Sequence, residues 1–458
     1  TNRGPGALSL TTADVTGTTY DAIYANNYGT DTDLTIDSSA GSVSGGTGTD
    51  LSGRPISGIR ANQRTTGSLN ITVDEVSGGT GIDADATTGA TTITLASTAV
   101  VTGLTRVGID AQSTGGAITV QGNSGDVVGA TVGMYVRSAG GDITVDTLDS
   151  VTGNASDGLD LGSAGGAISV NAVDAVLGTG GNGILADSDG GDITITGSGL
   201  VGGIEGTAGA GINANASGGT GGAITIAGNG DVTGGISAST DGAGSIAIDT
   251  STGSVTGFSG INANNRGSGV LSVITADVTS TSLVGIVARN LGTDLTIDSS
   301  AGSVSGVERG IEAANYGSGA LSLTTADVAS TNFEGISALN AASGTDLTID
   351  SSAGNVSGNR GIITNNQGTG ALSLTTKDVT GARFNGIYAV NSSNSADLMI
   401  DSSAGTVSGG AGIAVSSRSI YSGIFADHQS AGTLNITVDQ VSGGIGIDAD
   451  ATTGATTI

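Results

Sequence analysis

The sequence predicts an all-β fold, a right-handed parallel β-helix (β-solenoid) with about 17 coils of roughly 25 residues and three short strands per coil. Three observations predict this fold. Strand-like segments recur mostly every 24 to 26 residues, glycine interrupts the chain every few residues, and no apolar stripe of helical period runs through these segments. Because such short strands bury too little surface alone, each coil needs its neighbours. We therefore expect residues 1–458 to form a single continuous β-helix.

The first strand of each coil carries two aliphatic residues on either side of one residue that is nearly always Ser or Thr. Side chains two residues apart face the same side of a strand, so the aliphatic pair points inward and the hydroxyl points outward. The second strand is marked by a valine that is usually followed two residues later by Gly or Ser. Examples of the two patterns are Leu34–Ile36, Ile118–Val120 and Ile193–Ile195 for the first strand, and Val43, Val151 and Val304 for the second.

The third strand usually reads Gly-Ile-x-Ala. We expect its isoleucine to stack from coil to coil as an inward-facing column of the core. This core column is Ile23, Ile59, Ile82, Ile261, Ile286, Ile311, Ile336, Ile387 and Ile424. Three strands per coil imply three parallel sheets.

An asparagine often stands four residues after that isoleucine. Asparagine tolerates the left-handed conformation that a sharp corner requires, and its amide can bond to its counterparts in the coils above and below. The sequence therefore predicts a structural asparagine ladder at a corner. Its members are Asn27, Asn265, Asn290, Asn315, Asn340, Asn366 and Asn391.

A second column lies three residues before the isoleucine and contains many of the few aromatic residues of the chain. It allows two interpretations, an interior or corner stack and an exposed stripe for a sugar or a partner. The residues are Tyr20, Phe258, Leu283, Phe333, Phe384 and Tyr421.

The charge balance restricts the partners. Asp and Glu outnumber Lys and Arg 41 to 13, for a formal net charge of −28, so the chain is repelled by nucleic acid and by anionic membranes. We expect no nucleic-acid partner. The chain lacks an apolar run long enough to span a bilayer, so we expect membrane attachment only through a segment not present here.

Catalytic chemistry finds little support in the sequence. Cysteine is absent, and the single histidine, His428, lies in a short polar segment where we expect it on the surface. Serine nucleophiles then have no base to activate them. Two segments, 45–52 and 78–85, resemble a calcium-binding nonapeptide, but the motif is isolated rather than tandem. We expect no catalytic residue, no cofactor and no metal site.

Three insertions interrupt the regular spacing, near residues 46–57, 197–210 and 410–422. A solenoid accommodates such insertions as loops that bulge outward. These loops are the candidates for a specific recognition site, and the alternative is that they are merely tolerated.

Taken together, the aliphatic, Val-x-Gly and Gly-Ile-x-Ala-x-x-Asn columns resemble the passenger domains of bacterial autotransporters and the related filamentous haemagglutinin-like adhesins. The resemblance implies a secreted chain at the bacterial cell surface that serves adhesion, biofilm formation or surface coating. Possible partners are host-surface or matrix glycans and proteins, and further copies of the chain, end to end or side by side. Because residues 81–93 recur unchanged as 446–458, we also expect the chain to be a fragment of a longer repeat protein.

The function that we expect is that of a non-enzymatic extracellular structural or adhesive protein, such as a surface adhesin or a fibre-forming scaffold. The first alternative is a carbohydrate-active β-helix enzyme, a polysaccharide lyase or hydrolase. Such an enzyme would group carboxylates in one cleft framed by long loops. The second alternative is a filament subunit that assembles end to end.

Overall fold

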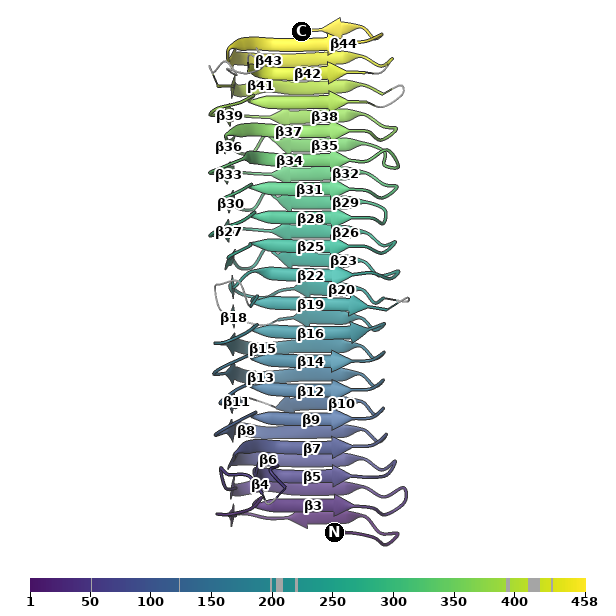
Figure 1. Cartoon of the computed structure of the whole chain (residues 1–458), viewed down its shortest axis with the longest axis vertical. Coiled ribbons are helices and arrows are strands. Elements are labelled where there is room, and N and C mark those ends of the chain that lie inside the picture. Colours follow the sequence, from purple (N-terminus) through teal and green to yellow (C-terminus); the bar gives the residue numbers. More distant parts are fainter. Residues whose placement is uncertain are drawn as a thin grey trace. The chain divides into compact units, whose positions relative to one another are not determined.

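The computed structural model describes residues 1–458 except 51, 123, 198–199, 203–208, 219–220, 393–395, 411–420 and 430. The fold is all-β, and parallel strands stack as a β-solenoid with about 17 turns of roughly 25 residues (Figure 1). The chain divides into two compact units, Thr1–Gly234 and Gly235–Ile458. Among the described residues, no helix is long and apolar enough to cross a membrane.

One sheet in each unit is built from the Ile-x-Ala segments and is called here the Ile-x-Ala sheet. In the first unit it contains β3 (Ile23–Asn27), β5 (Ser57–Gln63), β7 (Thr80–Ala86), β9 (Ile109–Ser113), β12 (Met134–Ser138), β14 (Leu159–Ser163), β16 (Ile184–Asp189) and β19 (Ile212–Ser217). In the second unit it contains β22 (Ile236–Thr240), β25 (Ile261–Asn265), β28 (Ile286–Asn290), β31 (Ile311–Asn315), β34 (Glu334–Asn340), β37 (Arg360–Asn366), β40 (Ile387–Asn391), β42 (Ser422–His428) and β44 (Ile445–Ala451).

The first and second strands of each turn form the other sheet. In the first unit these are β1 (Leu8–Thr11), β2 (Val15–Thr16), β4 (Leu34–Ser44), β6 (Leu69–Gly78), β8 (Thr91–Gly103), β10 (Ile118–Gly122), β11 (Gly125–Gly129), β13 (Ile143–Gly153), β15 (Ile168–Gly178), β17 (Ile193–Thr196), β18 (Leu200–Gly202), β20 (Ile224–Ala227) and β21 (Val232–Thr233). In the second unit they are β23 (Ile246–Thr250), β24 (Val255–Gly257), β26 (Leu271–Thr275), β27 (Val278–Ser280), β29 (Leu295–Ser299), β30 (Val304–Gly306), β32 (Leu321–Thr325), β33 (Val328–Ser330), β35 (Leu347–Ser351), β36 (Val356–Gly358), β38 (Leu372–Thr376), β39 (Val379–Gly381), β41 (Leu398–Ser408), β43 (Leu434–Ser442) and β45 (Thr456–Thr457).

The expectation of three separate sheets is wrong in one respect. In several turns the first and second strands continue as one long strand, as in β4, β6 and β13, so their two ladders belong to one sheet. In β4 the corner between them contains no residue with a positive φ, and it absorbs the change of direction as a register shift between Ser38 and Ser42. In β13 the corner instead includes Thr147, which has a φ of 55°. In these turns the two kinds of strand therefore form one strand, whereas in other turns they stay separate, as β26 and β27 do.

The predicted core column lies inside the solenoid. Ile23 is 4 % exposed, and the other eight isoleucines of the column are fully buried. The ladders are in register, so that Ile23 pairs with Ile59 and Ile59 pairs with Ile82. Because parallel neighbours lie about 4.8 Å apart, each isoleucine covers the one in the next turn.

Asparagines form a continuous ladder at the corner that follows the Ile-x-Ala strand of the second unit, and all six are fully buried. The Nδ2 atom of each residue donates to Oδ1 of the next: Asn265 to Asn290 (2.8 Å), Asn290 to Asn315 (3.0 Å), Asn315 to Asn340 (3.2 Å), Asn340 to Asn366 (3.0 Å) and Asn366 to Asn391 (3.4 Å). The same amides also bond the backbone of their own corner, as Asn315 does with the carbonyl oxygen of Gly319 (2.9 Å). The ladder thus fixes each corner and joins it to its neighbours.

Three details of this corner differ from the expectation. None of the ladder asparagines has a positive φ, so the left-handed conformation is not their role. His428 occupies the ladder position next to Asn391 and is fully buried, so its expected surface location is wrong. In the first unit the ladder is short: Asn27 accepts a bond from Nδ2 of Asn2 (2.8 Å), and serines such as Ser138 take over the corner in later turns.

Aspartates join neighbouring turns at two corners, the one between the first and second strands and the one that also carries the asparagine ladder. Their Oδ1 atoms accept the backbone N–H of a residue one turn further along, at distances between 2.7 and 2.9 Å. The pairs are Asp14–Ser42, Asp277–Ser303, Asp327–Asn355, Asp378–Thr406, Asp33–Ser68, Asp142–Ala167, Asp192–Ala223, Asp294–Ala320, Asp346–Ala371 and Asp397–Thr433. Much of the acidic charge of the chain therefore has a structural role.

Candidate functional site

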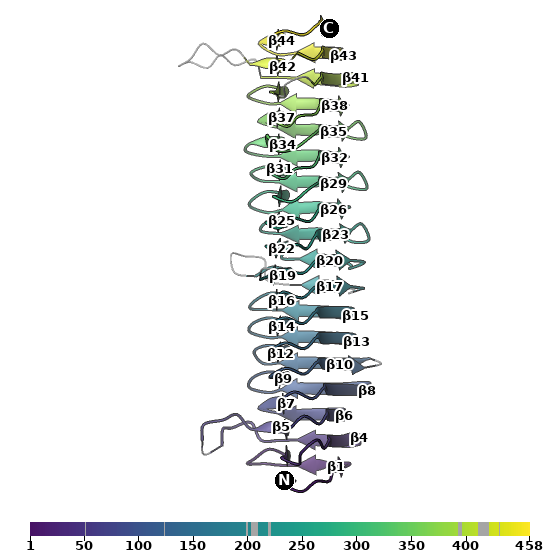
Figure 2. The ribbon, with the colours of Figure 1, turned by 90° about the vertical axis from the view of Figure 1, so that its right-hand side faces the viewer.

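The loop at residues 47–56 projects from the stack beside β5 (Figure 2). It folds back on itself, because Thr49 bridges Pro55 in antiparallel fashion and the N–H of Ile56 donates to the carbonyl oxygen of Gly48 (3.0 Å). All seven residues of β5 are buried, including the outward-facing Arg60. The loop therefore covers the outer face of one strand of the Ile-x-Ala sheet.

The in-register ladder brings charged residues from successive turns together on this face. The residue between Ile and Ala points outward, and the outward residues of β3, β5, β7 and β9 are Tyr24, Arg60, Asp83 and Asp110. Arg60 consequently lies between an aromatic ring on one side and a carboxylate on the other.

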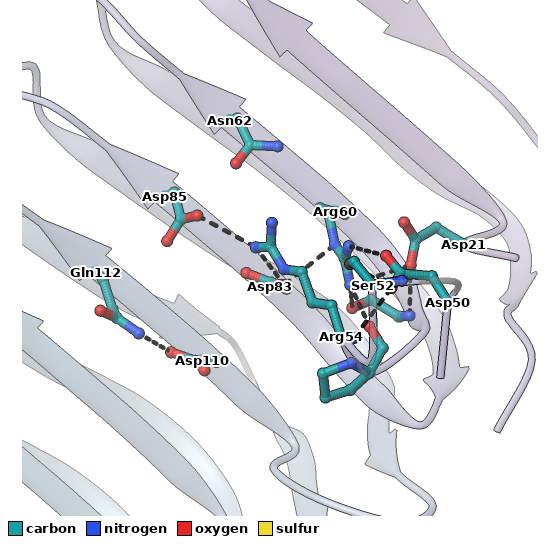
Figure 3. Close-up of polar contacts among 12 residues, drawn as sticks. Asp21, Asp50, Ser52, Arg54, Arg60, Asn62, Asp83, Asp85, Asp110 and Gln112 are labelled. Carbon is teal, nitrogen blue, oxygen red and sulfur yellow. Dashed lines mark hydrogen bonds and ion pairs between the residues drawn. The ribbon is translucent and has the colours of Figure 1, made fainter. Parts of the chain in front are cut away.

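Arg60 is the centre of an ion-pair cluster (Figure 3). Its guanidinium is 4 % exposed and lies 3.2 Å from Asp83, 3.4 Å from Asp21 and 3.9 Å from Asp50. It also donates to the carbonyl oxygen of Pro55. A buried guanidinium costs free energy unless opposite charge compensates it, and here three carboxylates and a carbonyl surround it.

Arg54 extends the cluster from the loop toward the next turn. Its Nη2 atom lies 3.1 Å from Asp83 and 3.4 Å from Asp85, and its side chain is 39 % exposed. Asp50 organises the loop tip by accepting the N–H groups of Ser52 (2.9 Å) and Arg54 (3.0 Å). The loop is thus tied to the sheet by charge and by the N–H of Thr80 of β7, which donates to the carbonyl oxygen of Ile56 (3.0 Å).

The pKa values of two carboxyl groups in the cluster are shifted in opposite directions. Burial raises the pKa of Asp83 to about 6, and this effect outweighs the attraction of Arg54 and Arg60. Hydrogen bonds from Ser52 and from the backbone of Arg54 lower the pKa of Asp50. Groups with such divergent environments are typical of functional sites, although structural ion pairs produce them as well.

A pocket of about 570 Å³ opens between the loop and the sheet. It is lined by Tyr20, Asp21, Tyr24, Asp50, Ser52, Arg54, Ile56 and Arg60. Tyr20 is 59 % exposed and Tyr24 is 57 % exposed, so both rings are open to solvent. This combination of aromatic surface with a few fixed polar groups is typical of small-ligand sites.

The structure describes only one of the three predicted recognition loops almost completely. The loop at 46–57 lines the pocket, whereas most residues of the 197–210 and 410–422 insertions lie outside the described residues. The predicted core column and asparagine ladder lie inside the solenoid and do not line the pocket.

The two calcium-like segments meet at this cluster. Asp50 comes from the first segment, and Asp83 and Asp85 come from the second. Their carboxylates contact the guanidinium groups of Arg54 and Arg60. Within the part of the chain that the structure describes, no group of three His, Asp or Glu residues is arranged to hold a metal ion.

The sequence analysis did not single out Arg60 or its pairing with Asp21, Asp50 and Asp83, although it named the loop that contains Arg54 and the segments that contain Asp50 and Asp83. A usable signal was present, because the residue between Ile and Ala faces outward, and stacking this column would have placed Arg60 beside Asp83. The sequence contains no comparable pattern for the contacts that the loop makes. Those contacts depend on the path of the loop, which its own hydrogen bonds determine.

The same stretch of sequence occurs twice. Residues 7–46 and 57–93 recur with changes as 371–410 and 422–458, which places Tyr388 at the position of Tyr24 and Phe425 at that of Arg60. In the second copy Tyr388 stacks on Phe425, with ring centroids 4.7 Å apart and planes 8° apart. The arginine of the first copy therefore leaves Tyr24 open, whereas the phenylalanine of the second copy covers the equivalent ring.

The predicted aromatic column lies at a partly exposed corner. Phe333 is 47 % exposed, and Phe384 packs edge-on against Tyr421 with centroids 5.0 Å apart. Guanidinium groups lie over these rings, Arg309 over Phe333 (5.5 Å) and Arg360 over Phe384 (5.2 Å). The column thus combines a corner stack with exposed ring surface.

The chain matches no family model, no curated protein and no solved structure.

Proposed function

We propose that the chain is a non-enzymatic structural and adhesive protein of the bacterial cell surface, in which the solenoid is the scaffold and the pocket beside Arg60 makes a specific contact. The observation that supports this most strongly is the use of the acidic residues. Corner aspartates such as Asp277 and Asp378 hold the backbone of the next turn. The grouped carboxylates Asp21, Asp50 and Asp83 are all bound by Arg60.

The extracellular location belongs to the same proposal. It is supported by the resemblance of the repeat columns to autotransporter passengers and haemagglutinin-like adhesins. A net charge of −28 favours solubility and disfavours non-specific attachment to anionic lipid.

A carbohydrate-active enzyme is the second candidate, and one observation favours it. Glycoside hydrolysis needs a carboxylic acid with a raised pKa and a second carboxylate that stays ionised, and Asp83 and Asp50 differ in this way. Against it, Asp83 does not line the pocket and is bound by two arginines, which disfavours the delivery of its proton to a substrate. Binding without turnover is therefore the better-supported role.

The two functions can be separated with the purified chain. It is incubated with neutral and uronic-acid polysaccharides, and reducing ends and unsaturated uronates are measured alongside retention of the chain on surfaces coated with each polymer. We expect retention without product. Product formation that is lost in both Asp83→Asn and Asp50→Asn would replace the adhesive proposal with the enzymatic one.

A further inference from the structure

We infer that the pocket between the 47–56 loop and β3 binds an uncharged pyranose unit of a glycan, with Tyr20 and Tyr24 as the stacking surface and Asp50 and Arg54 as the hydrogen-bonding groups. This inference deepens the proposed function and rests on it, because it names the ligand class of the same site. Its volume of about 570 Å³ lies within the range of small-ligand pockets.

Tyr20 and Tyr24 give the pocket its aromatic surface. The chain has only 7 tyrosines and 4 phenylalanines, and two of these eleven rings line one pocket with more than half of their surface exposed. A ring that leaves its face in water gains from covering by the apolar C–H face of a sugar, while its hydroxyl group stays hydrated. The equivalent ring in the second copy, Tyr388, is already stacked on Phe425.

Asp50 and Arg54 give the pocket polar groups that are held in place. Asp50 is fixed by Ser52 and by the backbone of Arg54, and Arg54 is fixed by Asp83 and Asp85. Both side chains remain partly exposed, Asp50 by 29 % and Arg54 by 39 %. A carboxylate has about four lone-pair positions and a guanidinium has five N–H groups, so each keeps bonding capacity for hydroxyl groups of a ligand. Because these groups are already held in place, little ordering is required on binding.

The charge balance selects a neutral ligand. Among the lining residues, the carboxylates of Asp21 and Asp50 are matched by the guanidinium groups of Arg54 and Arg60. A uronic acid would meet repulsion from these carboxylates and from Asp83 and Asp85 behind them. A cationic group would gain little, because the carboxylates already have arginine partners.

The experiment uses the full chain and isothermal titration with cellohexaose, mannohexaose, galactohexaose and hexagalacturonate. We expect at least one neutral hexasaccharide to bind and hexagalacturonate to bind more weakly. Tyr24→Ala should raise the Kd about tenfold or more, and so should Tyr20→Ala. The matched control is Tyr388→Ala, which removes the equivalent ring of the second copy and should leave the Kd unchanged. Thermal melts of the three variants verify folding.

Three results would overturn the inference: no binding of any neutral hexasaccharide, tighter binding of hexagalacturonate, or equal losses in Tyr24→Ala and Tyr388→Ala. Retention on coated surfaces distinguishes this failure from failure of the proposed function. If the Tyr20→Ala and Tyr24→Ala variants are retained to the same extent as the wild type, only the pocket assignment fails. If the wild type is not retained on any surface, the adhesive function fails.

Discussion

The Nε atom of Arg60 lies 3.2 Å from Oδ2 of Asp83, across the ladder that joins β5 to β7. The two residues belong to adjacent turns, so their contact depends only on the register of the parallel strands. Arg60 is nearly buried, whereas the aspartates around it keep different degrees of exposure. Burial of Asp83 raises its pKa, and this shift makes the stability of the first unit depend on pH.

Asp83→Asn should remove a pH dependence of the first unit. The pKa of Asp83 is about 6 in the folded chain, above the ordinary value of 3.8, so the folded chain holds this proton more tightly than the unfolded chain does. Stability therefore falls as the pH rises from about 4 to about 6, by about 2 to 3 kcal/mol if this group acts alone. Denaturant unfolding at several pH values in this window measures the slope, which Asp83→Asn should reduce.

The control for this experiment is Asp277→Asn. Bonds from the backbone and the hydroxyl of Ser303 lower the pKa of Asp277, so its stabilisation is present above pH 4 and is lost on further acidification. This variant should leave the slope between pH 4 and 6 unchanged. An unaltered slope in Asp83→Asn would contradict the assigned pKa.

Asp277→Ala should weaken the junction between two turns of the second unit. The carboxylate accepts the N–H and the hydroxyl of Ser303, each at 2.8 Å, and it lies at the surface. The expected loss is about 1 kcal/mol, because exposed hydrogen bonds contribute little net free energy. Hydrogen exchange of the Ser303 amide should accelerate, and Ser303→Ala, which keeps that amide bond, should affect it less.

Asn315→Ala should be more damaging than Asp277→Ala. Asn315 is fully buried, donates to Asn340 and to the corner backbone, and accepts from Asn290 (3.0 Å). Its loss leaves buried groups without partners, at a cost of about 2 to 4 kcal/mol. Denaturant unfolding of the second unit measures this cost. Asn315→Ser, which can bond its own corner as Ser138 does, should recover part of it.

Tyr388 and Phe425 should be energetically coupled. Their rings are stacked 4.7 Å apart, and a double-mutant cycle with alanine should give a coupling of about 0.5 to 1.5 kcal/mol. The matched cycle at the equivalent positions, Tyr24 and Arg60, tests whether the first copy lacks this contact. A coupling of equal size there would show that Tyr24 is covered as Tyr388 is.

The fold was largely predictable, because its determinants repeat. Inward positions such as Ile59 recur once per turn, and a period of roughly 25 residues leaves only stacking to bury them. The merging of first and second strands was not predictable, since it depends on the local backbone of each corner, such as the register shift between Ser38 and Ser42 of β4.

The site was predictable only in part. The insertion at 46–57 was recognised by its spacing, but its contacts with Arg60 depend on how the loop folds back through Thr49 and Pro55. His428 was misplaced because its polar neighbours suggested a surface segment, whereas its distance from Ile424 puts it at the ladder position. For such residues, position within the period is a better guide than local polarity.

Because the strands of the Ile-x-Ala sheet pair strictly in register, outward residues can be replaced without a change in the core column. An outward residue such as Arg60 has ladder partners only in the turns immediately before and after it, Tyr24 and Asp83. Replacing the outward residues of one turn therefore changes only the surface formed by that turn and its two neighbours. A turn that carries the arginine and its loop could be transplanted elsewhere in the array, so a long solenoid can display many different contact patches on one common backbone.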